Sequence, residues 1–276
     1  MFLILGEGNT GKSTADRILI EKSGILDFPQ SVVIEADEKI SSAKLDDRIK
    51  SMHLRNRDDF REIETLNARL MLVDTAGTSK VFMKDSVKNA KNLHSRGVII
   101  TPIMLVGARG ISDSEITEWL ETLVGLPKMY VVLNPMRNVS ESFLNDLEQR
   151  IKEIPGPTDK IFLRMPVLET AIAKELEIVG CALSKISQGL LSPKESNLLT
   201  YSSVILDVAD WETAVTMALQ PIIDDIVAAR PEALVEEISE DENPEFEAEP
   251  EAEPTMPDAD TVTAHKAAPT PKAKAK

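Results

Sequence analysis

Short runs of apolar residues alternate along this chain with longer segments in which apolar and charged residues share a helical period. A run of about four to eight apolar residues bounded by turn residues is typical of a buried strand, whereas apolar residues three and four positions apart are typical of an amphipathic helix. The pattern predicts strands at residues 2–5, 30–37, 70–74, 97–106, 129–134 and 160–163. It predicts helices at residues 13–22, 40–66, 80–95, 113–123 and 141–153, and a mostly helical segment at 170–229 with breaks near Gly180, Gly189 and Pro193.

Buried strands that alternate with helices are typical of an α/β fold, in which a doubly wound, mostly parallel sheet carries helices on both faces. Ligands of such sheets bind at the carboxyl ends of the strands. Four residues that suit ligand binding fall at predicted strand ends: Gly6, Asp37, Asp74 and Asn134. We therefore expect the functional site at that edge of the sheet.

The clearest motif follows the first strand. Residues 6–14, Gly-Glu-Gly-Asn-Thr-Gly-Lys-Ser-Thr, fit the phosphate loop G-x-x-x-x-G-K-[ST], and a helical pattern follows as the motif requires. Glycines let several backbone N–H groups approach a phosphate at once, and a helix N-terminus favours an anion. The predicted nucleotide-binding residues of this loop are Gly6, Gly8, Asn9, Thr10, Gly11, Lys12, Ser13 and Thr14. Lys12 is also expected to act in catalysis by reaching the β- and γ-phosphates.

A phosphate loop of this type binds its nucleotide with Mg²⁺, which prefers octahedral oxygen ligands. The predicted metal ligands are the Ser13 hydroxyl and Asp74, which ends an apolar strand. Asp37 is the candidate for orienting the attacking water or for holding Mg²⁺ through water, although acids at strand ends also stabilise loops. Glu35, two residues earlier, is the runner-up. Gly77 would let the loop after Asp74 change shape when the γ-phosphate is lost.

The turn that follows the strand predicted at 129–134 indicates which nucleotide base the protein binds. Proteins that bind GTP typically read guanine there with an Asn/Thr-Lys-x-Asp turn, whereas residues 134–137 of this chain are Asn-Pro-Met-Arg. ATP is therefore favoured as the nucleotide, with Asn134 available to hydrogen-bond the base. A purely structural role for Asn134 at the strand end is the alternative. The expected cofactors are ATP and Mg²⁺.

Composition separates the last segment from the rest of the chain. Residues 232–276 hold 13 acidic residues and 4 lysines, which accounts for −9 of the formal net charge of −15. A segment rich in Glu, Pro and Ala cannot bury enough apolar surface to offset chain entropy, so we expect it to be disordered. The predicted organisation is a P-loop nucleotide-binding domain at 1–180, a helical C-terminal extension packed on it at 181–230, and a disordered acidic tail at 231–276.

Cysteine content and hydropathy indicate the compartment. Cys181 is the only cysteine, which excludes an intramolecular disulfide and suits a reducing cytoplasm. The longest apolar stretch, residues 98–106, is interrupted by Thr101-Pro102 and is about half of the ~20 residues that a membrane-spanning helix needs. We expect a soluble, cytoplasmic protein with no membrane span.

Residues 1–180 resemble the ParA/MinD superfamily of deviant-Walker P-loop ATPases. The resemblance rests on the early phosphate loop, on Glu35-Ala36-Asp37, on Asp74-Thr75-Ala76-Gly77 and on Leu133-Asn134, and residues 8–14 are similar to the loop of plasmid stability proteins of the StbB type. It implies an ATP-dependent homodimer that acts in plasmid partition, stability or conjugal transfer. Most members carry a second lysine early in the loop, which reaches the partner subunit's nucleotide. Glu7 stands at that place here, which argues against an ATP sandwich built on this lysine.

The leading interpretation is a slowly hydrolysing regulatory ATPase that switches between partners or surfaces with its nucleotide state. Other chemistry is also found on this scaffold, because a fold does not fix a function. A kinase-like transferase acting on a small molecule would use arginines from a lid, and Arg55, Arg57 and Arg109 are candidates, although none lies in a recognisable lid. A nucleotide-binding adaptor without appreciable hydrolysis, with the tail as its interaction arm, is the third alternative.

The helix predicted at 80–95 carries a lysine stripe. Its members, Lys80, Lys84, Lys88 and Lys91, fall within one arc of the helix, opposite the apolar residues. An ordinary solvated face is one interpretation. The other is a surface for non-specific DNA binding or for an acidic partner, because Asp85 is the only acid of this helix and the helix follows the loop expected to sense the γ-phosphate.

Overall fold

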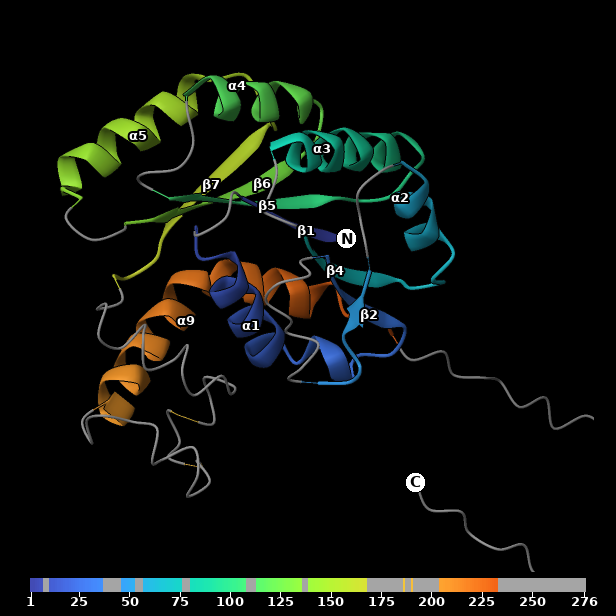
Figure 1. Cartoon of the computed structure of the whole chain (residues 1–276), viewed down its shortest axis with the longest axis horizontal. Coiled ribbons are helices and arrows are strands. Elements are labelled where there is room, and N and C mark those ends of the chain that lie inside the picture. Colours follow the sequence, from blue (N-terminus) through green and yellow to red (C-terminus); the bar gives the residue numbers. More distant parts are fainter. Residues whose placement is uncertain are drawn as a thin grey trace, which may run out of the picture. The chain divides into compact units, whose positions relative to one another are not determined.

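The computed structural model describes residues 1–6, 10–36, 46–52, 57–75, 80–107, 113–135, 139–167, 186, 190 and 204–232. Contacts divide the chain into two units, Met1–Ala233 and Leu234–Lys276, and the described residues all belong to the first. This unit has an α/β fold (Figure 1). Apart from its first two residues, the acidic tail predicted to be disordered lies outside the described residues.

Within the described residues, seven parallel strands form one sheet in the order β3-β2-β4-β1-β5-β6-β7. The strands are β1 (Phe2–Leu5), β2 (Ser31–Glu35), β3 (Lys50–Ser51), β4 (Leu70–Asp74), β5 (Thr101–Gly107), β6 (Lys128–Asn134) and β7 (Asp159–Arg164). Ile4 of β1 is paired with Asp74 on one side and with Ile103 on the other. The strand that precedes the phosphate loop is therefore the centre of the sheet.

Alternate residues of β1 enter two separate cores, because successive side chains of a strand point to opposite faces. Leu3 and Leu5 belong to one core, and Phe2 and Ile4 to the other. The first core is covered by α2 (Arg57–Glu64), α3 (Lys80–Ser95), α4 (Asp113–Thr122) and α5 (Glu141–Glu153). The second is covered by α1 (Lys12–Ser23), the short 3₁₀ helix η1 (Ile25–Asp27) and α9 (Val204–Ala228). Figure 1 shows these two helical layers on either side of the sheet.

The chain leaves the neighbouring strands β1 and β4 in opposite directions. From β1 it continues through α1 to β2, beyond β4, and from β4 it continues through α3 to β5, on the other side of β1. Such a reversal opens a crevice at the carboxyl ends of the two strands, and ligands of doubly wound sheets bind in that crevice. Gly6 and Asp74 lie at this edge of the sheet.

The predicted fold class is confirmed, and the α3 and α5 helices have the predicted bounds. α5 begins as its sequence suggests, because the Ser140 hydroxyl accepts a hydrogen bond from the N–H of Phe143 at 3.3 Å. β5 begins at Thr101 rather than at residue 97. The reason is that Gly97, with φ 95°, ends α3 in a turn in which its N–H donates to the carbonyl of His94 at 2.9 Å.

The prediction of a helix over residues 40–66 is wrong in part of its described range. Lys50 and Ser51 form β3, which pairs with β2, and the helix of this region is limited to α2. β3 has only two residues, both exposed and polar, so it has no apolar run that could have marked it as a strand. The turn before it is held by Arg48, whose guanidinium donates to Asp46 and Asp27, each at 2.7 Å.

The helical pattern near the C-terminus is represented by α9, which packs against α1. The hydroxyl of Tyr130 in β6 lies 2.9 Å from the carbonyl of Pro221 and 2.7 Å from Oδ2 of Asp225, and so fastens the helix to the sheet. The breaks expected near Gly180, Gly189 and Pro193, and Cys181, lie outside the described residues. In the part of the chain that the structure describes, no helix has the length and apolar character needed to cross a membrane.

Arg164, at the end of the edge strand β7, joins this strand to α5. Its guanidinium donates to Glu141 at 2.7 Å, to Asn145 at 2.6 Å and to Glu148 at 2.8 Å. Hydrogen bonds from Lys152 and Arg164 lower the pKa of Glu148 in the folded protein. Its ionised form therefore stabilises the fold above the unfolded pKa, and this stabilisation is lost as the pH falls through the folded pKa.

We expect Glu148→Gln to lower the free energy of unfolding by about 1 kcal/mol at pH 7, because it removes an ion pair that is partly shielded from solvent. The difference from wild type should shrink as the pH falls below 4.5, the ordinary value for glutamate. Denaturant unfolding at pH 7 and pH 3 measures it, with Glu153→Gln on the exposed side of α5 as the control. A difference that is the same at both pH values would contradict the assignment.

Candidate phosphate-binding site

Gly6, directly after β1, lies where the backbone has no room for a side chain. A Cβ at this position would be 2.8 Å from Oγ1 of Thr10 and 2.9 Å from the carbonyl oxygen of Leu105 in β5. Both distances are shorter than real Cβ contacts, and the carbonyl belongs to a strand in the centre of the sheet. Glycine is therefore required where the chain leaves the sheet to form the predicted phosphate loop.

Gly11 immediately precedes α1 and has φ 91°, a left-handed conformation that favours glycine. A Cβ on Gly11 would lie 2.6 Å from Nδ2 of Asn134. Its carbonyl already accepts the first bond of the helix, from the N–H of Ala15 at 3.0 Å. The N–H groups of the first turn of α1, which carry partial positive charge, therefore lie at the carboxyl end of β1, where an anion would bind.

Lys12 and Asp74 face each other at this edge of the sheet. The ammonium of Lys12 lies 3.7 Å from Oδ1 of Asp74, and the two side chains are 5% and 1% exposed. The backbone after Asp74 is fixed because the hydroxyl and the N–H of Thr75 both donate to the carbonyl of Ile4, at 2.7 and 3.2 Å. A buried cation from the first residue of α1 thus faces a buried carboxylate at the end of β4.

Two more buried carboxylates belong to the elements around this pair. Glu35 ends β2 and is paired in register with Asp74, so both point to the same face of the sheet, and Glu35 is 1% exposed. Asp16, one turn after Lys12 on α1, is also 1% exposed. Asp16 was not predicted, although an acid four residues after the loop lysine, on the apolar face of α1, was a signal for it.

Asn134 connects the end of β6 to the phosphate loop. Its Nδ2 donates to the carbonyl of Thr10 at 3.0 Å, across 124 positions in the sequence. The amide has a second proton and Oδ1 left for other partners. The base-binding role predicted for Asn134 and its structural role at the strand end can therefore coexist in one side chain.

The structure brings together most of the described residues that the motif singled out. Those within reach of one another are Gly6, Thr10, Gly11, Lys12, Asp74 and Asn134. Ser13 and Thr14 are half-buried in the first turn of α1. Predicted residues outside the described part of the chain are Glu7, Gly8, Asn9, Asp37, Gly77, Arg55 and Arg109. Of the lysine stripe on α3, Lys88 and Lys91 are exposed, and the side chains of Lys80 and Lys84 are not described.

The residues present fit a nucleotide bound with Mg²⁺. Phosphate oxygens need cations and N–H donors, which Lys12 and the N-terminus of α1 supply. Among the described residues, no three His, Cys, Asp or Glu side chains gather as a metal site by themselves. A metal in this crevice would therefore combine phosphate oxygens with Ser13 and Asp74, which is how proteins commonly hold Mg²⁺.

Comparisons with known proteins add little to this geometry. No protein-family model matches the chain, and no curated protein matches it. Among solved structures, the chain is similar to FlhF in its crystal structure with GMPPNP and Mg²⁺, at 12% sequence identity and a TM-score of 0.38. The similarity covers 59% of this chain and 65% of the FlhF chain, so this chain matches less than two thirds of the length of that protein. A likeness of this degree identifies no activity.

Proposed function

We propose that this protein binds a nucleoside triphosphate with Mg²⁺ in the crevice between β1 and β4 and hydrolyses it slowly. The observation that carries the proposal is the pair formed by Lys12 and Asp74, 3.7 Å apart and both buried. The pair lies at the N-terminus of α1, behind a loop in which Gly6 and Gly11 have no room for a Cβ. A buried pair costs desolvation free energy, and its presence is explained when its groups serve a ligand.

In this proposal each residue has a separate task. Lys12 and the N-terminal N–H groups of α1 bind the β- and γ-phosphates, and Ser13 and Asp74 hold Mg²⁺. The metal, when bound, neutralises the charge that develops on the phosphates. Asp37 orients the attacking water, and Glu35, which lies in register with Asp74, is the alternative for that task.

We propose ATP as the nucleotide. Residues 134–137 have no acid that could accept the hydrogen bonds of guanine N1 and N2, since the turn reads Asn-Pro-Met-Arg. One proton of the Asn134 amide is used by the carbonyl of Thr10, and Oδ1 is an acceptor suited to the exocyclic amine of adenine. A discrimination of this kind is strong when the wrong base leaves buried polar groups unpaired.

The biological role that we propose, a regulatory ATPase of plasmid partition, stability or transfer acting as a homodimer, rests on the sequence resemblance. The exposed Lys88 and Lys91 of α3 support a contact with DNA or with an acidic partner during the ATPase cycle. DNA binding would then fall steeply with salt, because each phosphate contact releases counterions.

The purified protein would be tested for equilibrium binding of ATP and GTP, with and without Mg²⁺, and for release of labelled phosphate. We expect ATP to bind more tightly than GTP, and phosphate to be released slowly. Asp37→Asn should leave binding near wild type and lower turnover at least tenfold, because orienting water matters only after ATP is bound.

Several outcomes of this experiment would count against the proposal. Absence of binding of both nucleotides would refute the site itself. Tighter binding of GTP would refute the choice of base, and wild-type turnover of Asp37→Asn would move the water-orienting task to Glu35. Transfer of the label to a metabolite of a cell extract, instead of release as phosphate, would identify a transferase.

A further inference from the structure

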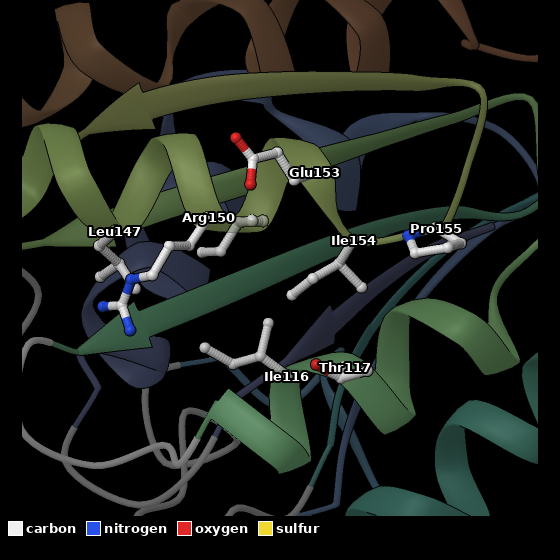
Figure 2. A pocket seen from close by; sticks show the side chains of 8 residues that line it. Ile116, Thr117, Leu147, Arg150, Glu153, Ile154 and Pro155 are labelled. Carbon is white, nitrogen blue, oxygen red and sulfur yellow. The ribbon is translucent and has the colours of Figure 1, made fainter.

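A groove lies between α4 and α5, on the face of the sheet opposite α1 and α9 (Figure 2). Its volume is about 350 Å³. It is lined by Ile116, Thr117, Leu147, Arg150, Ile151, Glu153, Ile154 and Pro155. None of these residues belongs to the phosphate-binding site, so the groove is a separate feature of the molecule.

The interior of the groove is apolar. Its deepest residues, Ile116, Leu147 and Ile151, are no more than 5% exposed and belong to the core on this face. Ile154 is half-buried and Pro155 is exposed at the end of α5. Figure 2 shows Ile116 of α4 and Ile154 extending into the space between the two helices, so apolar atoms line both sides.

The apolar strip continues beyond the groove along α5. Phe143 is four residues before Leu147 and therefore lies on the same side of the helix. It is 40% exposed, so part of its ring is open to solvent. Phe143 and Leu147 on α5, and Ile154 directly after the end of the helix, thus provide apolar side chains along this side of the groove.

Charge differs between the two walls. On α4, Glu121 is four residues after Thr117 and so lies on its groove side, whereas Glu118, one residue after Thr117, lies about 100° further round the helix, toward solvent. Both glutamates are exposed. α4 contains no lysine or arginine in its ten residues. On α5, Arg150 and Glu153 have opposite charges and balance each other. The α4 wall is therefore negative, whereas the α5 wall is neutral.

We propose that this groove binds an amphipathic helix of a partner protein, with the basic side of that helix against α4. A space of this size accepts about two or three apolar side chains at i, i+3, i+4 or i+7 spacing, which is how helices dock in grooves. Lysines or arginines on one flank of the partner would face Glu118 and Glu121, and this complementarity fixes the orientation of the helix.

Docking at the groove leaves the phosphate-binding site accessible. Lys12 and Asp74 belong to the opposite face of the sheet, where α1 lies, so a partner on α4 and α5 does not cover them. Nucleotide binding therefore serves as an independent check that a groove variant is folded and active. Failure of the groove proposal and failure of the nucleotide proposal can be told apart.

The probe is a synthetic helical peptide with leucines at i, i+3, i+4 and i+7 and lysines along one flank. A second peptide has glutamates in place of the lysines, and a third has the first composition in scrambled order. Affinities would be measured by fluorescence anisotropy on the full chain, and the binding surface by changes in backbone amide NMR shifts. We expect only the peptide with lysines to bind, and its affinity to fall as salt is raised. Its binding should change the NMR shifts of backbone amides in α4 and α5 only.

Two groove variants and one control complete the test. Thr117→Trp should fill the groove, and Glu118→Lys with Glu121→Lys should reverse the charge of its wall, each weakening the lysine peptide at least tenfold. Asp207→Lys with Asp210→Lys makes the same charge change at exposed positions of α9, on the other face, and should leave binding unchanged. The proposal is overturned if the lysine peptide does not bind, if the glutamate peptide binds equally well, if the charge-reversed groove variant binds like the wild type, or if the shifts map to the α1 face.

Discussion

Lys12→Met is expected to abolish detectable binding of ATP with Mg²⁺, a loss of at least a hundredfold in affinity. The ammonium lies 3.7 Å from Oδ1 of Asp74 at the start of α1. Phosphates depend most on a charged donor where water is largely excluded, and here the lysine side chain is 5% exposed. Isothermal titration with ATP and Mg²⁺ measures the effect, and Lys88→Met on the exposed surface of α3 is the control.

The same substitution should also destabilise the fold. Removing one partner of a buried ion pair takes away the opposite charge that offsets the desolvation of the other, which typically costs about 3–5 kcal/mol. A structural effect could therefore imitate a functional one. Asp74→Asn in the Lys12→Met background separates them, because removal of both charges should restore most of the lost unfolding free energy without restoring ATP binding.

The double variant decides between two roles for the pair. If Lys12→Met with Asp74→Asn is as stable as the wild type and still does not bind ATP, the charges of the pair serve the ligand and are not needed for the fold. If this variant binds ATP like the wild type, the pair is a structural element and the assignment of the phosphate loop is wrong. Loss of stability in the single variant with full ATP affinity would lead to the same conclusion.

Sequence reasoning predicted those parts of the site that depend on neighbouring residues. The apolar run of β1, the glycines after it and Lys12 at the start of α1 follow one another in the chain, so a motif describes them. Asp74 was predicted because it ends a second apolar strand, and parallel strands bring their carboxyl ends to one edge. These predictions needed only a local motif and the knowledge that the sheet is parallel.

The remaining features depend on distances between elements, which no local pattern contains. The bond from Asn134 to Thr10 joins residues 124 positions apart and depends on the order of β1, β5 and β6 in the sheet. The groove between α4 and α5 likewise results from how two helices are spaced over the sheet. The short strand β3 was missed because its pairing with β2, and not its composition, makes it a strand.

Gly11→Ala is expected to lower the free energy of unfolding clearly more than Gly97→Ala. The two glycines have nearly the same φ, 91° and 95°, so a side chain should cost each about 1–3 kcal/mol in backbone strain. At Gly97 a Cβ meets nothing within 4 Å, whereas at Gly11 it would lie 2.6 Å from Nδ2 of Asn134. The difference between the two variants therefore measures the contact with Asn134.

Gly11→Ala should also change the phosphate-binding site. The clash at Gly11 would displace the Asn134 amide from the carbonyl of Thr10 and shift the first turn of α1, on which the phosphates depend. We expect Gly11→Ala to weaken ATP binding at least tenfold, and Gly97→Ala, at the far end of α3, to leave it unchanged.

A double-mutant cycle with Asn134→Ala tests the contact directly. Without the amide, the cost of Gly11→Ala should fall to that of Gly97→Ala, because only the backbone strain is left. Chemical denaturation of the four variants of the cycle gives the coupling free energy, and ATP titrations show whether affinity follows it. Equal costs of Gly11→Ala with and without the amide would mean that Asn134 moves aside freely, and that β6 is not coupled to the phosphate loop through this bond.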